Sequence, residues 1–249
     1  MTLGDFSQQA ETYDLSRPDY PRALVETLAS EASVTPGDDV ADFGAGTGIF
    51  TRLLLELGLN VSAIEPNNAM KQRANLPGAT WVDGTFESSK LPAESQSWAV
   101  AAQAFHWAQP EAALPEIRRV LRPNGVFTVL WNDRDNENCD VLQWTEEAIR
   151  RHVPEFDEAY RARPWGEILQ STGHFESLSH RIQRHTITMN RERYLNLWRS
   201  HNRLNNTAGH ERFEAFFTDL SNHLESENIN TIDVPYACNA WSVRRVELL

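Results

Sequence analysis

The stretch from residue 40 to residue 50 constrains the fold of this chain more than any other part of its sequence. It reads Val-Ala-Asp-Phe-Gly-Ala-Gly-Thr-Gly-Ile-Phe, so an apolar run ends in Asp42 and three glycines follow at alternate positions. Glycine has no Cβ and tolerates positive φ, which lets the backbone turn sharply and approach a ligand closely. A helix beginning at Ile49 would point its unpaired N–H groups at the same place. The stretch predicts a strand, a binding loop and a helix, although a tight turn without a ligand would use the same glycines.

Strands and helices are expected to alternate over the first half of the sequence. Apolar runs predict the strands, and apolar residues at helical spacing predict the helices. The expected strands are 39–43, 60–65, 81–87 with its turn, 97–102 and 126–131, and the expected helices are 21–30, 49–57, 67–73 and 110–121. This order indicates an α/β fold with a parallel, doubly wound sheet and helices on both faces.

The second half of the sequence has a different composition. A polar, charged loop is expected over 133–140. The expected helices are 141–152, about 165–170, 191–202 and 211–225, and the expected strands are 180–189 and 234–246. These are the sixth and seventh expected strands, and the family resemblance given below implies that they finish a seven-stranded sheet, one of them antiparallel.

Composition narrows the possible partners. The 249 residues carry a formal net charge of −12, and both nucleic acid and anionic membranes attract basic surfaces, so neither partner is expected. No apolar run approaches the ~18 residues that span a bilayer, and the polar N-terminus does not resemble a signal peptide. Cys139 and Cys238 form neither a disulfide framework nor a metal-binding spacing. We expect a cytoplasmic monomer or homodimer without a metal ion.

Two further strand ends carry side chains suited to a ligand. Glu65 follows the second expected strand, where an acid in an α/β sheet can accept hydrogen bonds from ribose hydroxyls. His106 lies between two aromatic residues after the fourth strand, which suggests a pocket wall. The alternatives are a glutamate that faces solvent and aromatic residues that belong to the core.

The order Asp-x-Gly-x-Gly-x-Gly over 42–48 resembles motif I of the class I S-adenosylmethionine-dependent methyltransferases. The dinucleotide fingerprint Gly-x-Gly-x-x-Gly would instead need a glycine at position 49, which is Ile. The sequence Ala-Gln-Ala-Phe-His-Trp over 102–107 is similar to a signature of a small-molecule branch that includes trans-aconitate-type methyltransferases. The resemblance covers roughly residues 5–132, and it implies a Rossmann-like sheet with a helical lid.

The resemblance also implies a layout for the whole chain. It implies one methyltransferase domain over 1–249, with an N-terminal cofactor lid, a cofactor-binding core, a partly inserted helical acceptor lid and a closing strand. Their expected bounds are 1–20, 21–132, 133–230 and 231–249.

The family pattern implies which residues hold S-adenosyl-L-methionine. Arg17 would face the methionine carboxylate in a bidentate pair, unless it is simply a surface arginine. Glu65 would bind the ribose, and the turn after the third strand would meet the adenine. The expected cofactor-binding residues are Tyr13, Arg17, Asp42, Gly44, Ala45, Gly46, Glu65, Pro66, Met70, Gly84, Thr85, Phe86 and Gln103.

The methyl acceptor is expected to be a small molecule with a carboxylate, a hydroxyl, or a carbon or nitrogen nucleophile. His106 is the candidate catalytic base, because an unperturbed histidine titrates near pH ~6.5, or it only shapes the pocket. The expected acceptor-binding residues are Tyr20, Phe105, His106, Trp107, Trp131, Trp198, Arg199 and His201. Two other functions stay open: an NAD-dependent oxidoreductase, and a protein that binds S-adenosylmethionine without methyl transfer.

Overall fold

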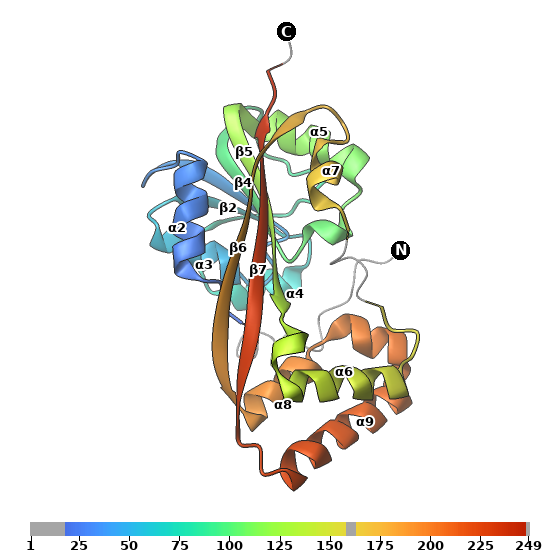
Figure 1. Cartoon of the computed structure of the whole chain (residues 1–249). Coiled ribbons are helices and arrows are strands. Elements are labelled where there is room, and N and C mark those ends of the chain that lie inside the picture. Colours follow the sequence, from blue (N-terminus) through green and yellow to red (C-terminus); the bar gives the residue numbers. More distant parts are fainter. Residues whose placement is uncertain (1–17, 158–162, 248–249) are drawn as a thin grey trace. The chain divides into compact units, whose positions relative to one another are not determined.

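Figure 1 shows the computed structural model of the chain, which describes residues 18–157 and 163–247. Seven strands form one sheet in the order β3-β2-β1-β4-β5-β7-β6. The chain divides into two compact units, and each is described by itself. The sheet unit comprises Asp19–Asn132 and the described parts of Ala162–Gln183 and Cys238–Leu249. The helical unit comprises the described parts of Met1–Pro18 and Asp133–Arg161, together with Arg184–Ala237.

The parallel strands of the sheet unit bring their carboxyl ends to one edge of the sheet. All the pairs that join β1 with β2, β1 with β4, β2 with β3 and β4 with β5 are parallel. The chain runs outward from β1 to β3 and then crosses to β4 on the other side of β1, so the strand order reverses between β1 and β4. In open α/β sheets, ligands bind beyond the carboxyl ends of the strands at such a switch point. The bounds are β1 Asp39–Phe43, β2 Asn60–Ile64, β3 Thr80–Val82, β4 Gln96–Ala102 and β5 Leu121–Arg134.

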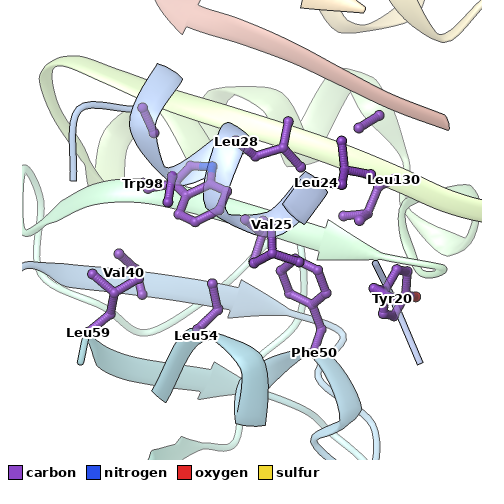
Figure 2. Packing of buried hydrophobic residues seen from close by; sticks show 14 of the residues in the cluster. Tyr20, Leu24, Val25, Leu28, Val40, Phe50, Leu54, Leu59, Trp98 and Leu130 are labelled. Atoms are coloured by element: carbon purple, nitrogen blue, oxygen red, sulfur yellow. The ribbon is translucent and has the colours of Figure 1, made fainter. Parts of the chain in front are cut away.

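Helices cover both faces of these strands. α2 and α3 pack on one face, where Figure 2 shows Leu24, Leu28 and Leu54 with the strand residues Trp98 and Leu130. Strand side chains alternate between faces, so β5 sends Val126 and Leu130 to this core and Phe127 to the opposite face. The helices of the unit are α2 Arg22–Glu31, α3 Ile49–Glu56, α4 Asn68–Ala74, α5 Pro110–Val120 and α7 Trp165–Gln170, with a short 3₁₀ helix η1 at Phe105–Trp107.

The opposite face holds a chain of contacting rings, which we call the aromatic cluster. Phe105 lies near its centre, with its ring 5.5 Å from Phe86, 5.3 Å from Phe127 and 6.1 Å from Trp165, all centroid to centroid. Such edge-to-face pairs contribute about 0.5–1.5 kcal/mol each beyond the burial of their area. The cluster consists of Phe43, Phe86, Phe105, Phe127, Trp131 and Trp165.

The helical unit has a separate core. Its helices are α6 Asp140–His152, α8 Arg191–Arg199 and α9 Asn202–Ser226, preceded by the 3₁₀ helix η2 Asn136–Asn138. Their apolar faces meet around Trp198, Phe216 and Leu220, which are fully buried. The remaining strands are β6 Phe175–Asn190 and β7 Thr231–Arg245. No helix in the two described ranges is both long and apolar enough to cross a bilayer.

The predicted α/β fold class is confirmed, and most element bounds agree to within two residues. Two elements were predicted too long, since β3 ends at Val82 rather than at 87 and α8 at Arg199 rather than at 202. Four elements were predicted too short, and the first is β5, which spans Leu121–Arg134 rather than 126–131. β6 begins at Phe175 rather than at 180. The prediction missed its first part because residues 176–179, Glu-Ser-Leu-Ser, lack the strict alternation that signals a strand. β7 begins at Thr231 rather than at 234. α9 begins at Asn202 and continues past Gly209, whose φ of 70° and ψ of 167° break the helix and hid its first part from the sequence pattern.

The core of the helical unit gives a matched test on neighbouring residues of α9. Phe216 is fully buried, whereas Phe217 is only partly buried against the same core. We expect Phe216→Ala to lower the free energy of unfolding by ~3–5 kcal/mol, the usual loss for a buried phenylalanine, and Phe217→Ala to lower it clearly less. Urea unfolding of both variants checks this. Equal losses would contradict the described orientation of α9.

Candidate functional site

The glycine loop is tied to the end of the neighbouring strand. The backbone N–H groups of Gly44 and Ala45 both donate to the carbonyl oxygen of Ile64, at 2.9 and 3.1 Å. Gly44 has a φ of 69°, and a Cβ built on it would lie 2.6 Å from the Cβ of Ala104. Gly46 has a φ of 60°, but a Cβ there would have no atom of the described residues within 4 Å. Gly44 is therefore required by packing, while Gly46 borders open space that a ligand can enter.

Glu65 connects the end of β2 to the same loop. Its two carboxylate oxygens accept from the N–H groups of Gly46 at 2.9 Å and Asn67 at 2.8 Å. The residue is only 8% exposed, and this burial raises the pKa of its carboxyl group, against the effect of those two hydrogen bonds. An ionised carboxylate has about four lone-pair sites, so each oxygen can still accept a further hydrogen bond. The two backbone bonds fix where those sites point.

Asp42 lies near the end of β1, two residues before Gly44 of the glycine loop. Its Oδ2 accepts from the hydroxyl of Thr51 at 2.6 Å, and its Oδ1 has no partner in the described part of the chain. Burial raises the pKa of this carboxyl group to about 7, with the nearby Glu65 charge acting in the same direction. Thr51 belongs to the helix that begins after the loop, so this bond joins strand and helix below the glycines.

The residues expected near adenine lie around β2 and β3. Met70 is buried in α4, whose first N–H groups are capped by the side-chain oxygen of Asn67, and Pro66 before it is half-buried. Gly84 packs against backbone, because a Cβ there would lie 2.6 Å from the carbonyl oxygen of Ser89. Thr85 closes a turn by accepting from the N–H of Ser88 at 3.2 Å.

The aromatic cluster extends from this turn to the loop. The ring of Phe86 is 3.4 Å from the position of a Cβ on Gly44, and it stacks on Phe43. Phe105 is fully buried within the cluster. In this structure Phe86 and Phe105 support the loop from within the core.

Gln103 occupies an unusual backbone conformation at the end of β4. Its φ is 55°, its N–H donates to the carbonyl oxygen of Leu130, and its side-chain amide donates to that of Asn132 at 3.2 Å. The ends of β4 and β5 are thus joined by a single residue. Sequence reasoning placed Gln103 at the site but did not predict this left-handed conformation.

His106 and Trp131 form the acceptor side of the predicted site. The indole Nε1 of Trp131 donates to Nδ1 of His106 at 3.4 Å. Trp131 is 1% exposed and stacks on Trp165, with ring centroids 4.3 Å apart and an interplanar angle of 19°. Trp107, beside His106, is 48% exposed. Trp165 was not among the predicted site residues, because it follows a segment without regular hydrophobic spacing.

The first described residues, including Asp19 and Tyr20, are held at the carboxyl ends of the parallel strands. Tyr20 is 9% exposed and its ring meets that of Phe50 edge-on at 5.1 Å. The carbonyl oxygen of Asp19 accepts from the side-chain amide of Asn132 at 3.3 Å. Tyr20 therefore lies near the start of α3 and the end of β5. Tyr13 and Arg17 lie outside the described residues.

The last three predicted acceptor residues belong to the helical unit. Trp198 is fully buried, with the guanidinium of Arg134 4.3 Å from its ring centroid and the imidazole of His201 stacked at 5.7 Å. Nδ1 of His201 also accepts from the N–H of Leu204 and caps α9. Arg199 lies over the ring of Phe217 at 3.8 Å and pairs with Glu214 at 3.3 Å. These contacts account for the three residues within their own unit.

Comparison with known proteins decides the family. The family described as "Methyltransferase domain" matches residues 41–129. An uncharacterised methyltransferase from Geobacillus thermodenitrificans is 30% identical over 157 residues, which are 58% of this chain and 72% of that protein. This chain belongs to the class I S-adenosylmethionine-dependent methyltransferases. An uncharacterised methyltransferase from Mycobacterium tuberculosis is 38% identical over 144 residues, and this match spans 57% of the present chain but only 56% of the length of that relative.

Solved structures share the fold. A protein from Anaeromyxobacter dehalogenans, provisionally described as a type II methyltransferase, gives a TM-score of 0.65 at 23% identity, covering 92% of this chain and 97% of that one. A Haemonchus contortus phosphoethanolamine N-methyltransferase in complex with S-adenosylhomocysteine gives 0.55 at 12% identity, covering 99% and 61%. The [4+2]-cyclase SpnF gives 0.52 at 15% identity, covering 92% and 84%. The same fold therefore occurs in proteins of different activity.

Within residues 18–157 and 163–247, no three or more His, Cys, Asp and Glu side chains are grouped closely enough to hold a metal ion.

The raised pKa of Asp42 makes stability depend on pH. The folded protein holds this proton from the ordinary pKa of 3.8 up to about 7, a range in which the unfolded chain has released it. Stability should therefore fall as the pH rises through this range. An asparagine side chain cannot titrate but can still accept from Thr51. The free energy of unfolding of Asp42→Asn should therefore rise relative to that of the natural protein between pH 4 and pH 8. The gain is up to about 4 kcal/mol, because each pKa unit corresponds to about 1.36 kcal/mol. Urea unfolding at both pH values checks this, and a difference that does not change with pH would contradict it.

Proposed function

We propose that this methyltransferase moves a methyl group from S-adenosylmethionine to a small-molecule acceptor at the carboxyl ends of β1, β2 and β4. The observation that carries the proposal is the loop at Gly46, which borders open space and donates its N–H to the carboxylate of Glu65. An open backbone edge beside a buried, oriented carboxylate is suited to the ribose of a nucleoside. The net charge of −12 favours a small molecule over a nucleic acid as the acceptor.

The residues of the sheet unit fit the cofactor in a consistent order. The spare lone pairs of Glu65 can accept from ribose hydroxyls, because its backbone partners leave each oxygen with a free site. Met70 and the turn at Gly84 to Phe86 follow β2 and β3, on the side where the adenine would lie. The family resemblance adds Tyr13 and Arg17, with the guanidinium of Arg17 as the partner of the methionine carboxylate.

S-adenosylmethionine supplies an activated methyl group on a sulfonium, so the protein mainly has to orient the acceptor and exclude water. Correct orientation alone can lower a barrier by roughly 7–11 kcal/mol at best. The exposed ring of Trp107, the buried ring of Tyr20 and the imidazole of His106 are the proposed acceptor contacts of the sheet unit. Trp131 holds the imidazole of His106 through its indole hydrogen bond. For Trp198, Arg199 and His201 of the helical unit, the role in acceptor binding stays a prediction from the sequence.

A second function is favoured by one specific comparison. The cyclase SpnF shares the fold over 92% of this chain, so the same framework occurs in a protein named for a different reaction. Binding of S-adenosylmethionine without methyl transfer would fit the loop equally well. The two functions differ in their product, because only methyl transfer increases the mass of the acceptor by one methyl group. An NAD-dependent oxidoreductase is disfavoured by Ile49 at the third fingerprint position.

Cofactor binding can be tested at Gly46 with a matched control. Gly46 and Gly37 have φ values of 60° and 94°, and in the described part of the chain no atom lies within 4 Å of a Cβ built on either. Alanine at both positions therefore carries the same kind of backbone strain, about 1–2 kcal/mol, but only Gly46 lies at the proposed site. We expect the natural protein to bind S-adenosylmethionine with micromolar affinity and not to bind NAD. Gly46→Ala should bind S-adenosylmethionine at least ~10-fold more weakly, which corresponds to about 1.4 kcal/mol. Gly37→Ala should bind it as the natural protein does.

Isothermal titration calorimetry measures the affinity of all three proteins for S-adenosylmethionine and for NAD. Tight NAD binding, or equal effects of the two substitutions on S-adenosylmethionine affinity, would contradict the assignment of the loop.

The reaction itself can be tested with methyl-labelled S-adenosylmethionine and a panel of small acids, phenols and amines. We expect one acceptor class to gain a single labelled methyl group, detected by mass spectrometry, with equimolar formation of S-adenosylhomocysteine. Because NAD-dependent chemistry produces neither product, the experiment separates the classes. An acceptor that is consumed in the presence of S-adenosylmethionine without gaining a methyl group would favour the second function instead.

A further inference from the structure

The hydrogen bond between Trp131 and His106 determines which nitrogen of His106 carries its proton. An indole N–H can only donate, so the Nδ1 atom that it reaches at 3.4 Å must offer a lone pair. Neutral imidazole has one protonated and one unprotonated nitrogen. In neutral His106 the proton therefore lies on Nε2, and this nitrogen can donate a hydrogen bond but cannot accept a proton.

Trp131 is held firmly enough to impose this arrangement. It lies in β5 with its ring 1% exposed. One face stacks on Trp165 at 4.3 Å, and Trp241 meets the ring at 5.8 Å with an interplanar angle of 67°. Turning the indole to release His106 would break both ring contacts. The direction of the N–H is thus set by the packing of the cluster.

We propose that Trp131 is a positioning residue, which fixes His106 as a hydrogen-bond donor through Nε2 and prevents it from acting as the general base of methyl transfer. This inference rests on the proposed function, because it concerns the acceptor side of the same site. Of the two roles that the sequence left open for His106, it selects the pocket residue that orients the acceptor.

The arrangement also restricts the acceptor. Any acceptor group that bonds to Nε2 must accept the hydrogen bond, and the atom that becomes methylated must bring its own lone pair. That pair forms the bond to the methyl carbon, the carbon–sulfur bond breaks, and its electrons remain on the sulfur. No proton passes to His106. Acceptors that must lose a proton to this histidine are excluded.

The tautomer can be measured directly by NMR. In protein labelled with ¹⁵N-histidine, long-range ¹H–¹⁵N correlation separates protonated from unprotonated ring nitrogens, and His106→Gln identifies the resonances of His106 among the eight histidines. We expect protonated Nε2 and unprotonated Nδ1 in the neutral imidazole of His106 in the natural protein. Trp131→Phe keeps a ring to stack on Trp165 but removes the donor, and it should shift His106 toward a mixture of tautomers.

Trp98→Phe is the matched control for the loss of an indole donor. Nε1 of Trp98 donates to Thr128 at 3.0 Å in the core on the other face, so its removal should leave the nitrogen shifts of His106 unchanged. A protonated Nδ1 in the natural protein, or the same His106 shifts in Trp131→Phe as in the natural protein, would overturn the proposal.

Kinetics give an independent readout once an acceptor is known. The side-chain amide of glutamine can donate from about the position of Nε2 but cannot act as a base. We expect His106→Gln to lower kcat by less than about 10-fold and to act mainly on the KM of the acceptor, whereas loss of a general base would lower kcat by ~10²–10⁴-fold. A loss of kcat in that larger range would overturn the proposal. If no acceptor is ever methylated, the proposed function fails, while the NMR result still decides the tautomer.

Discussion

The binding loop depends on how the end of β2 holds it. Ile64 accepts two N–H groups of the loop through its carbonyl oxygen, and Glu65 accepts a third through its side chain. These three bonds fix the backbone at Gly44 to Gly46 without any ligand, so the site is preorganised. Preorganisation reduces the entropy that a ligand would otherwise lose on ordering the loop. The end of the second strand therefore supplies a carboxylate and also fixes the backbone of the binding loop.

Local sequence signals predicted the parallel half of the sheet and the loop. Apolar runs and glycine positions act within about ten residues, so the strands from Asp39 to Trp131 and the helices between them could be identified from spacing alone. The bond from Gly46 to Glu65 joins residues 19 apart and could not be predicted in this way, because it depends on the register of β1 and β2. The family resemblance named both residues but not their contact.

The aromatic cluster shows a different limit. Phe105 and His106 were predicted together as a pocket wall, yet adjacent residues in a 3₁₀ helix point in different directions, and Phe105 is fully buried while His106 is not. Trp165 packs on Trp131 although no sequence pattern connects them, since the contact arises only when α7 covers the sheet. The sequence therefore located the acceptor side of the site but could not separate supporting rings from exposed ones.

The central claim is that the loop at Gly46 and the carboxylate of Glu65 bind the nucleoside of S-adenosylmethionine. A crystal structure of the protein with S-adenosylhomocysteine tests it most directly. The account predicts both ribose hydroxyls within hydrogen-bond distance of Glu65, with the nucleoside in the open space beside Gly46 and the loop backbone unchanged. A nucleoside bound elsewhere, or a ribose that does not contact Glu65, would contradict it.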